Sequence, residues 1–143
     1  MPKRPPQVQL PYTPARANRT LPLVGRIVED LVACYAKWRA AVSRFEYATT
    51  GSRAELPDAD AALLEAEAQA LAKQIEGFVG ELQELGLECR ALDTGLVDFP
   101  GELDGRPVYF CWMRGESAVE HWHEIGAGFS GRQQLHDSEL ARP

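Results

Sequence analysis

Residues 96–113 read LVDFPGELDGRPVYFCWM. Two runs rich in β-branched and aromatic residues flank Asp104-Gly105, a dipeptide that favours the type I′ turn of a β-hairpin. With these two residues as the turn, Leu103 pairs with Arg106, and the remaining pairs follow by counting outward along both strands. The pairs that matter most here are Phe99 with Phe110, Asp98 with Cys111, and Val97 with Trp112.

A third strand is predicted after this hairpin. Arg114 to Ser117 reads as a second turn, and the chain then returns as residues 118–125. A turn of two or four residues places His121 and His123 on the apolar face, with Cys111 and Glu124 opposite, whereas an odd-length turn exchanges the faces. We expect a three-stranded antiparallel β-meander over about residues 95–125. The alternative is a short helix over residues 117–126, which would place Glu116, Glu120, His123 and Glu124 on one face.

Two heptad patterns precede the strands and predict helices over about residues 21–47 and 58–86. An earlier helix start at Thr13-Pro14 is expected to be short or kinked, because Pro22 follows it. The two stripes have equal length and a short connection, so we predict a long antiparallel helical hairpin, coiled-coil-like, packed on the apolar face of the meander. The fold class is therefore α+β. The heptad positions are Val24, Val28, Leu31, Tyr35, Trp38, Val42 and Phe45, then Leu64, Ala68, Leu71, Ile75, Phe78, Leu82 and Leu85.

The length of 143 residues indicates a single domain. We predict a disordered, proline-rich arm over residues 1–12, an α+β domain over residues 13–132, and a polar tail over residues 133–143. A flanking stripe on the first helix, formed by Ile27, Cys34 and Ala41, needs cover from the sheet or from a second copy of the chain. We therefore expect a homo-oligomer, preferably a dimer, associated through the helices.

The composition restricts the partners and the compartment. Fifteen basic against 21 acidic residues give a net charge of −6, which disfavours nucleic acid as a partner. Three widely spaced cysteines with no Cys-x-x-Cys pair argue against a disulfide framework, and a reducing cytoplasm is the simplest setting. The N-terminus has no apolar signal segment, and no apolar run reaches the roughly 18 residues of a membrane span. We expect a cytoplasmic protein without a membrane partner.

Several short motifs resemble a bacterial family known as domain of unknown function 2203. The resemblance covers nearly the whole chain and is most specific over residues 95–132. It implies the domain boundaries and ranks the motif residues, but it implies no activity. An aromatic residue more often stands at position 121 in that family, so His121 weakens any mechanism that needs both histidines. The motifs are Thr13-Pro14, Ala17-Asn18, Leu21-Pro22, Asp98-Phe99-Pro100, Cys111-Trp112, Gly115-Glu116, Trp122-His123-Glu124 and Gly128-Phe129-x-Gly131-Arg132.

A metal site is the main functional hypothesis from the sequence. His121-x-His123 on a strand projects two imidazoles to one side, as in many transition-metal sites. Glu116 and Glu124 are the expected additional ligands, and zinc or iron is the expected metal, with haem as an alternative cofactor. Against this stands a structural role in which the histidines are satisfied by Glu116 or by a backbone carbonyl.

Two further hypotheses assign the protein to other functional classes, anion binding and non-catalytic assembly. Glycines around Arg132 would let its guanidinium close on a small anion, with Asp98 and Trp122 nearby. Alternatively, the chain is a non-catalytic assembly or adaptor protein that uses the helical hairpin. Cys111 is interpreted as a buried apolar residue, because no base lies clearly on its face. The sequence identifies no reaction, and whether the protein is an enzyme is left open.

Overall fold

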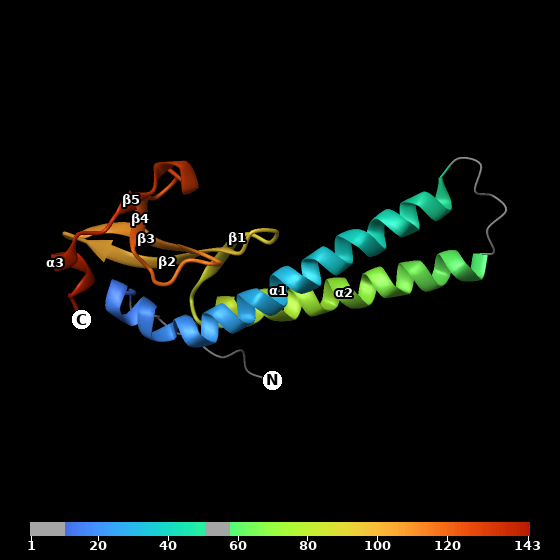
Figure 1. Ribbon diagram of the computed structural model, residues 1–143, viewed down its shortest axis with the longest axis horizontal. Helices are drawn as coiled ribbons and strands as arrows, with labels where there is room; N and C mark the ends of the chain where they lie inside the picture. Colours follow the sequence, from blue (N-terminus) through green and yellow to red (C-terminus); the bar gives the residue numbers. More distant parts are fainter. Residues whose placement is uncertain (1–10, 51–57) are drawn as a thin grey trace, which may run out of the picture.

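The computed structural model describes residues 11–50 and 58–143. Two long helices are followed by a five-stranded antiparallel sheet that lies at one end of the helical pair (Figure 1). The fold class is α+β, as predicted, but the sheet has five strands rather than three. The elements are α1 (Pro14–Thr49), α2 (Asp58–Glu84), β1 (Glu88–Ala91), β2 (Leu96–Leu103), β3 (Arg106–Met113), β4 (His121–Glu124), η1 (Phe129–Gly131), β5 (Gln133–Gln134) and α3 (Asp137–Leu140).

Helix α1 begins earlier than the heptad pattern predicted. The Thr13 hydroxyl caps it by accepting the backbone N–H of Arg16 at 3.1 Å, and Pro14 occupies the start of the helix. The helix continues through Pro22, and it bends in its blue N-terminal part (Figure 1). Proline cannot donate the helical hydrogen bond and crowds the preceding turn, so it bends the helix without ending it.

Helices α1 and α2 lie side by side and run in opposite directions (Figure 1). Leu31 and Leu82 are fully buried in the core near the sheet. The flanking stripe of Ile27, Cys34 and Ala41 is buried within the single chain. For example, the Cys34 sulfur lies 3.6 Å from the backbone carbonyl oxygen of Leu71 in α2. Among the described residues, no helix has the length and apolar character needed to cross a membrane.

The predicted hairpin is confirmed residue by residue. Strands β2 and β3 pair with Leu103 opposite Arg106 and Asp98 opposite Cys111. Asp104 and Gly105 form the turn, and both have positive φ angles, 53° and 80°, as a type I′ turn requires. The apolar face of this hairpin packs into the core with the helices, also as predicted. Its buried residues are Val97, Phe99, Val108, Phe110 and Trp112.

The face predicted for the histidines is wrong. Strand β4 pairs with β3 so that His123 lies opposite Tyr109 and His121 opposite Cys111. Both histidines therefore share a face with Cys111 and point away from the helical core, whereas Trp122 points into the core. The cause is the odd number of residues, 114–120, between the two strands, since a turn of two or four residues would have given the opposite alternation. Residues 118–120 are outside the strand, and 117–126 is not a helix.

The chain ends are more ordered than predicted. Tyr12, assigned to the arm, is buried: its backbone N–H donates to Pro100 at 2.8 Å and its hydroxyl to the Leu85 carbonyl at 2.5 Å. Residues 133–143, predicted as a polar tail, contribute β5, α3 and the buried Leu135. The tail prediction failed because two leucines, Leu135 and Leu140, five residues apart among mostly polar residues give no periodic signal. The rest of the predicted arm, residues 1–10, and residues 51–57, which belong to the predicted connection between the helices, lie outside the described residues.

Candidate metal centre

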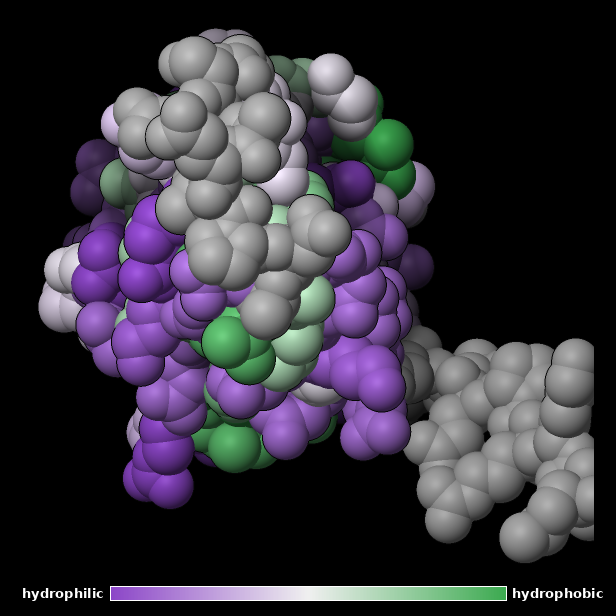
Figure 2. Space-filling model, turned by 90° about the vertical axis from the view of Figure 1, so that its right-hand side faces the viewer, coloured by the Kyte–Doolittle hydropathy of each residue, from purple (hydrophilic) through white to green (hydrophobic). Residues whose placement is uncertain are grey.

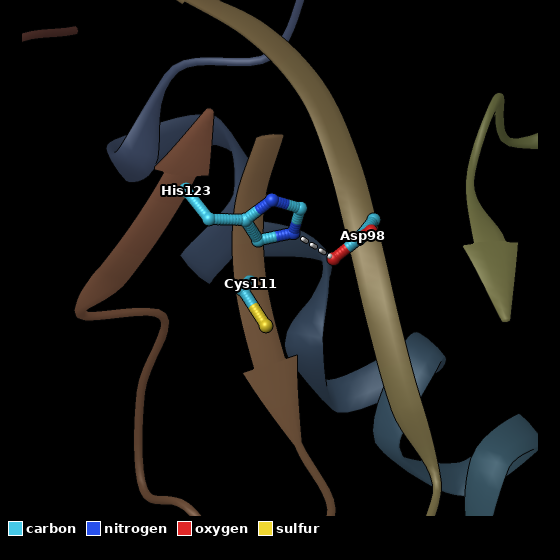
Figure 3. A group of neighbouring side chains, drawn as sticks. All are labelled: Asp98, Cys111 and His123. Carbon is cyan, nitrogen blue, oxygen red and sulfur yellow. Dashed lines mark hydrogen bonds and ion pairs between the residues drawn. The ribbon is translucent and has the colours of Figure 1, made fainter. Parts of the chain in front are cut away.

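Three buried side chains from three adjacent strands converge on the sheet face that points away from the helices. Asp98 comes from β2, Cys111 from β3 and His123 from β4 (Figure 3). Their ligand atoms all lie within 4.8 Å of one another. The His123 imidazole reaches across β3 toward Asp98, and the Cys111 sulfur lies beside this contact (Figure 3). The alternation of the strands places all three side chains on one face, so the sheet itself builds the cluster.

Both ring nitrogens of His123 face acceptors. Nδ1 lies 2.8 Å from the backbone carbonyl oxygen of Glu124, and Nε2 lies 3.0 Å from Oδ1 of Asp98. A carbonyl oxygen only accepts, so Nδ1 must carry a proton and donate it. Nε2 then faces a carboxylate oxygen across a short distance. A proton or a metal ion must therefore lie between Nε2 and Oδ1.

Asp98 is held from its other side by a cation. Arg90 in β1 donates from Nε to Oδ2 of Asp98 at 3.0 Å, and its guanidinium lies over the Tyr109 ring, 5.2 Å from the ring centroid. The Asp98 side chain is only 3% exposed, and the Arg90 ion pair and the His123 contact together give both of its oxygens a partner in the interior. Because Oδ2 accepts the hydrogen bond from Arg90, Oδ1 is the Asp98 oxygen that could bind an ion in the cluster.

Cys111 is a poor nucleophile in this setting. Burial raises the pKa of its thiol to about 12, and the nearby Asp98 carboxylate adds to this effect. At neutral pH the group is therefore a thiol. A thiol with so high a pKa does not attack substrates, but a bound metal ion deprotonates it outright and takes the thiolate as a ligand. The interpretation of Cys111 as an unreactive buried residue thus holds only for the metal-free protein.

The three groups have the chemistry of a metal site with an open position. Thiolate, imidazole and carboxylate are all zinc ligands, and three protein ligands leave the fourth tetrahedral position free. Neighbouring ligand atoms around tetrahedral zinc lie roughly 3.3 to 3.8 Å apart. The separation of Asp98 and His123, 3.0 Å, is slightly below this range, and all the ligand atoms of the cluster lie within 4.8 Å of one another. The Nδ1 hydrogen bond of His123 also matches the usual support of a ligating imidazole.

A pocket of about 260 Å³ adjoins the cluster. Asp98, His123 and Arg90 contribute its polar lining. Its other lining residues are largely apolar: Leu96, Tyr109, Gly126, Gly128 and Phe129. Gly126 and Gly128 have φ angles of 87° and 66°, a backbone conformation that favours glycine. Asp98 and His123 therefore border a space that can hold a small ligand, whereas Cys111 does not line it.

The four predicted metal ligands are not brought together. Glu116 instead receives two hydrogen bonds from Arg132, at 2.7 and 2.9 Å, and one from the backbone N–H of Met113 at 2.7 Å. His121 lies beside this pair, with Nδ1 3.7 Å from Glu116. Glu124 forms an ion pair with Arg106 at 2.7 Å near the end of the sheet. Only His123 of the predicted set belongs to the cluster.

The predicted anion-binding residues are also separated. Arg132 is committed to Glu116, and Asp98 pairs with Arg90 and His123 rather than with Arg132. Trp122 lies on the apolar face, where its ring packs in the core. The sequence hypothesis of a free arginine closing on an anion therefore lacks its free arginine.

Sequence reasoning missed Cys111 as a site residue and placed Asp98 in another site. A signal for both was present, because the hairpin register already put Asp98 directly opposite Cys111. The three cluster residues also lie in three separate motifs of the family resemblance, Asp98-Phe99-Pro100, Cys111-Trp112 and Trp122-His123-Glu124. Arg90 had no such signal, because its strand was not predicted.

Comparison with known proteins gives one match. The family model described as "Uncharacterized conserved protein (DUF2203)" matches residues 11–135. No curated protein and no solved structure matches the chain. The matched range includes the whole cluster and all strands of the sheet.

Proposed function

Because the chain belongs to the DUF2203 family of uncharacterized conserved proteins, we propose a function from the site alone. We propose that Asp98, Cys111 and His123 bind one divalent transition metal ion of the zinc type. Of the ligands predicted from the sequence, this set retains only His123. Three ligands that converge on one point suit a single ion better than haem, which takes its protein ligands along one axis.

One observation carries the proposal. The 3.0 Å contact between Nε2 of His123 and Oδ1 of Asp98 needs a proton or a metal ion between the two atoms, because Nδ1 already uses its proton on the Glu124 carbonyl. Cys111 adds a sulfur ligand at the same place. A second ring proton satisfies the histidine equally well in the metal-free protein, so metal binding and proton binding compete at this position.

Cobalt(II) titration of the metal-free protein tests the proposal, since cobalt(II) takes zinc sites and is visible by absorption. We expect one cobalt ion per chain and a thiolate-to-cobalt charge-transfer band in the near ultraviolet. Because the Cys111 pKa is raised to about 12, binding must release the thiol proton, and the affinity should fall as the pH is lowered. His123→Ala should weaken binding by more than about 100-fold, since even residues that only support a ligand contribute 10- to 100-fold.

Two variants make this test specific. Cys111→Ser should remove the charge-transfer band, because the band requires a sulfur ligand. His121→Ala is the matched control: it lies two residues from His123 on the same strand and outside the cluster, so its cobalt affinity should equal that of the unmodified chain. Cobalt bound without the charge-transfer band, or bound equally by His123→Ala, would refute the proposal.

A homodimer through the helices is a second, independent proposal. Helices α1 and α2 extend well beyond the sheet (Figure 1), and Tyr47 and Leu63 near their far end are 61% and 70% exposed. Seen from that end, the surface is mostly hydrophilic with small hydrophobic patches (Figure 2). A second copy covering these patches would account for the exposed apolar side chains. The three free cysteines support the proposal that the protein works in the cytoplasm.

Sedimentation velocity tests the dimer. We expect the sedimentation coefficient to rise with protein concentration toward that of a dimer, and Leu63→Glu to shift the chain to the monomer because it buries a charge in the interface. Lys73→Glu serves as a control for the added negative charge on α2. A single monomeric species at all concentrations would contradict the proposal and would leave the metal site untouched.

A further inference from the structure

The pocket beside the candidate metal centre has a polar inner wall and an apolar outer part. Asp98 and His123 line the inner wall, and Tyr109 and Phe129 provide aromatic surface. Its volume of about 260 Å³ is below the 300–1,000 Å³ of pockets that hold drug-sized ligands. A ligand that reaches the metal through this pocket must therefore be small.

Resting on the proposed metal site, we propose that the pocket binds a small carboxylic acid with an apolar, preferably aromatic, body. The carboxylate takes the open coordination position of the metal, and the apolar body lies against Tyr109 and Phe129. The proposal names a ligand class for the site and goes beyond metal binding.

The remaining N–H donors of Arg90 favour an anion at the metal. A divalent ion with one thiolate and one carboxylate ligand would be neutral overall, and the charge of Arg90 in the pocket wall is balanced by Glu88. Nε of Arg90 is bound to Asp98 and one terminal nitrogen lies 2.5 Å from Glu88. A guanidinium carries five N–H donors in a planar fork that matches a carboxylate. Arg90 can therefore hold Asp98 in place and still donate to a carboxylate in the pocket.

The rest of the lining favours an apolar body. Phe129 lines the pocket and is 47% exposed, so part of its ring is open to a ligand. The Arg132 guanidinium lies over its ring, 4.9 Å from the centroid, and Arg132 is itself fixed by Glu116. Phe129 is thus a positioned surface beside the pocket. Aromatic rings in such sites bind planar, apolar groups by stacking or edge contacts.

Three probes separate the parts of the proposal in the cobalt-loaded full chain. Benzoate has the carboxylate and the ring, acetate has the carboxylate alone, and benzyl alcohol has the ring without the charge. We expect benzoate to change the visible cobalt bands saturably, with an affinity at least about tenfold higher than that of acetate, a factor that corresponds to 1.4 kcal/mol. Benzyl alcohol should leave the bands unchanged, because it brings no anion to the metal.

Phe129→Ala should weaken benzoate binding by about five- to tenfold, a loss typical of one aromatic contact, and leave the cobalt affinity and acetate binding unchanged. The matched control is Ile125→Ala, which removes an equally exposed apolar side chain that does not line the pocket. Cobalt bound with its thiolate band but equal affinities for benzoate and acetate would overturn this inference and leave the metal proposal standing. Benzoate binding that survives Phe129→Ala unchanged would also overturn it. A chain that takes up no cobalt would overturn both.

Discussion

Asp98→Ala is expected to lower the free energy of unfolding of the metal-free protein by about 3 to 5 kcal/mol. The substitution removes a carboxylate that is 3% exposed and leaves the His123 ring, 4% exposed, without its hydrogen-bond partner. It also removes the buried partner of Arg90. Removing one member of a buried polar network is among the most destabilising changes that one substitution can make. Urea denaturation followed by circular dichroism, with a chelator present, measures the effect.

Two controls separate the buried charge pair from a general loss of packing. Glu88→Ala removes the half-exposed partner of the same Arg90 and should cost less than about 1 kcal/mol. The double variant Asp98→Ala, His123→Ala should lose clearly less free energy of unfolding than the sum of the two single variants. In the double variant neither side chain is left in the interior without its partner. Strict additivity would mean that Asp98 and His123 do not interact as the structure shows.

Gly101→Ala is expected to destabilise the fold by about 3 kcal/mol, as severe overpacking does. A Cβ at this position would lie 2.5 Å from the backbone oxygen of Tyr12 and 2.9 Å from Cδ2 of Phe110, and closer still to Cε2 of the same ring. Neither neighbour can withdraw freely. Tyr12 is held by hydrogen bonds to Pro100 and Leu85, and the Phe110 ring is fully buried in the core. The midpoint of thermal or urea unfolding reports the loss.

Gly80→Ala is the matched control for this substitution. Gly80 lies within α2, and an added Cβ there meets no atom within 4 Å. Alanine should stabilise the helix by about 1 kcal/mol, since glycine is a poor helix former. The same chemical change should therefore have opposite signs at the two positions. A cost below about 1 kcal/mol at Gly101 would show that the segment around Tyr12 yields readily and is not part of the core.

Local patterns predicted much of the fold. Asp104-Gly105 determined the hairpin register, because a two-residue turn allows only one way to count the pairs. The heptads predicted both helices, although the start of α1 depended on Thr13-Pro14 rather than on its apolar stripe. Strand β1 was missed because it has only four residues, and the apolar positions of its alternation, Cys89 and Ala91, carry small side chains that give a weak signal. Such a strand forms through its pairing with β2 rather than through its own sequence.

The candidate site was harder to predict, because its residues depend on the connection between β3 and β4. The turn there has no length signature such as Asp-Gly, and one residue more or less moves His123 to the other face. Side-chain anchoring fixes the observed choice: Asn18 in α1 accepts the backbone N–H of Val119 at 2.7 Å and donates to its carbonyl oxygen at 3.2 Å. That contact joins residues far apart in sequence, and no local pattern reveals it.

The connection between β3 and β4 has a consequence for the evolution of the family. An insertion or deletion of two residues in 114–120 keeps His123 beside Cys111, whereas a change of one residue rotates the whole of β4 and would bring Trp122 out of the core. Only a compensating β-bulge could rescue such a change. Among related proteins, the length of this connection should therefore differ mainly by even numbers of residues. Where it differs by an odd number, Cys111 or His123 should also be replaced.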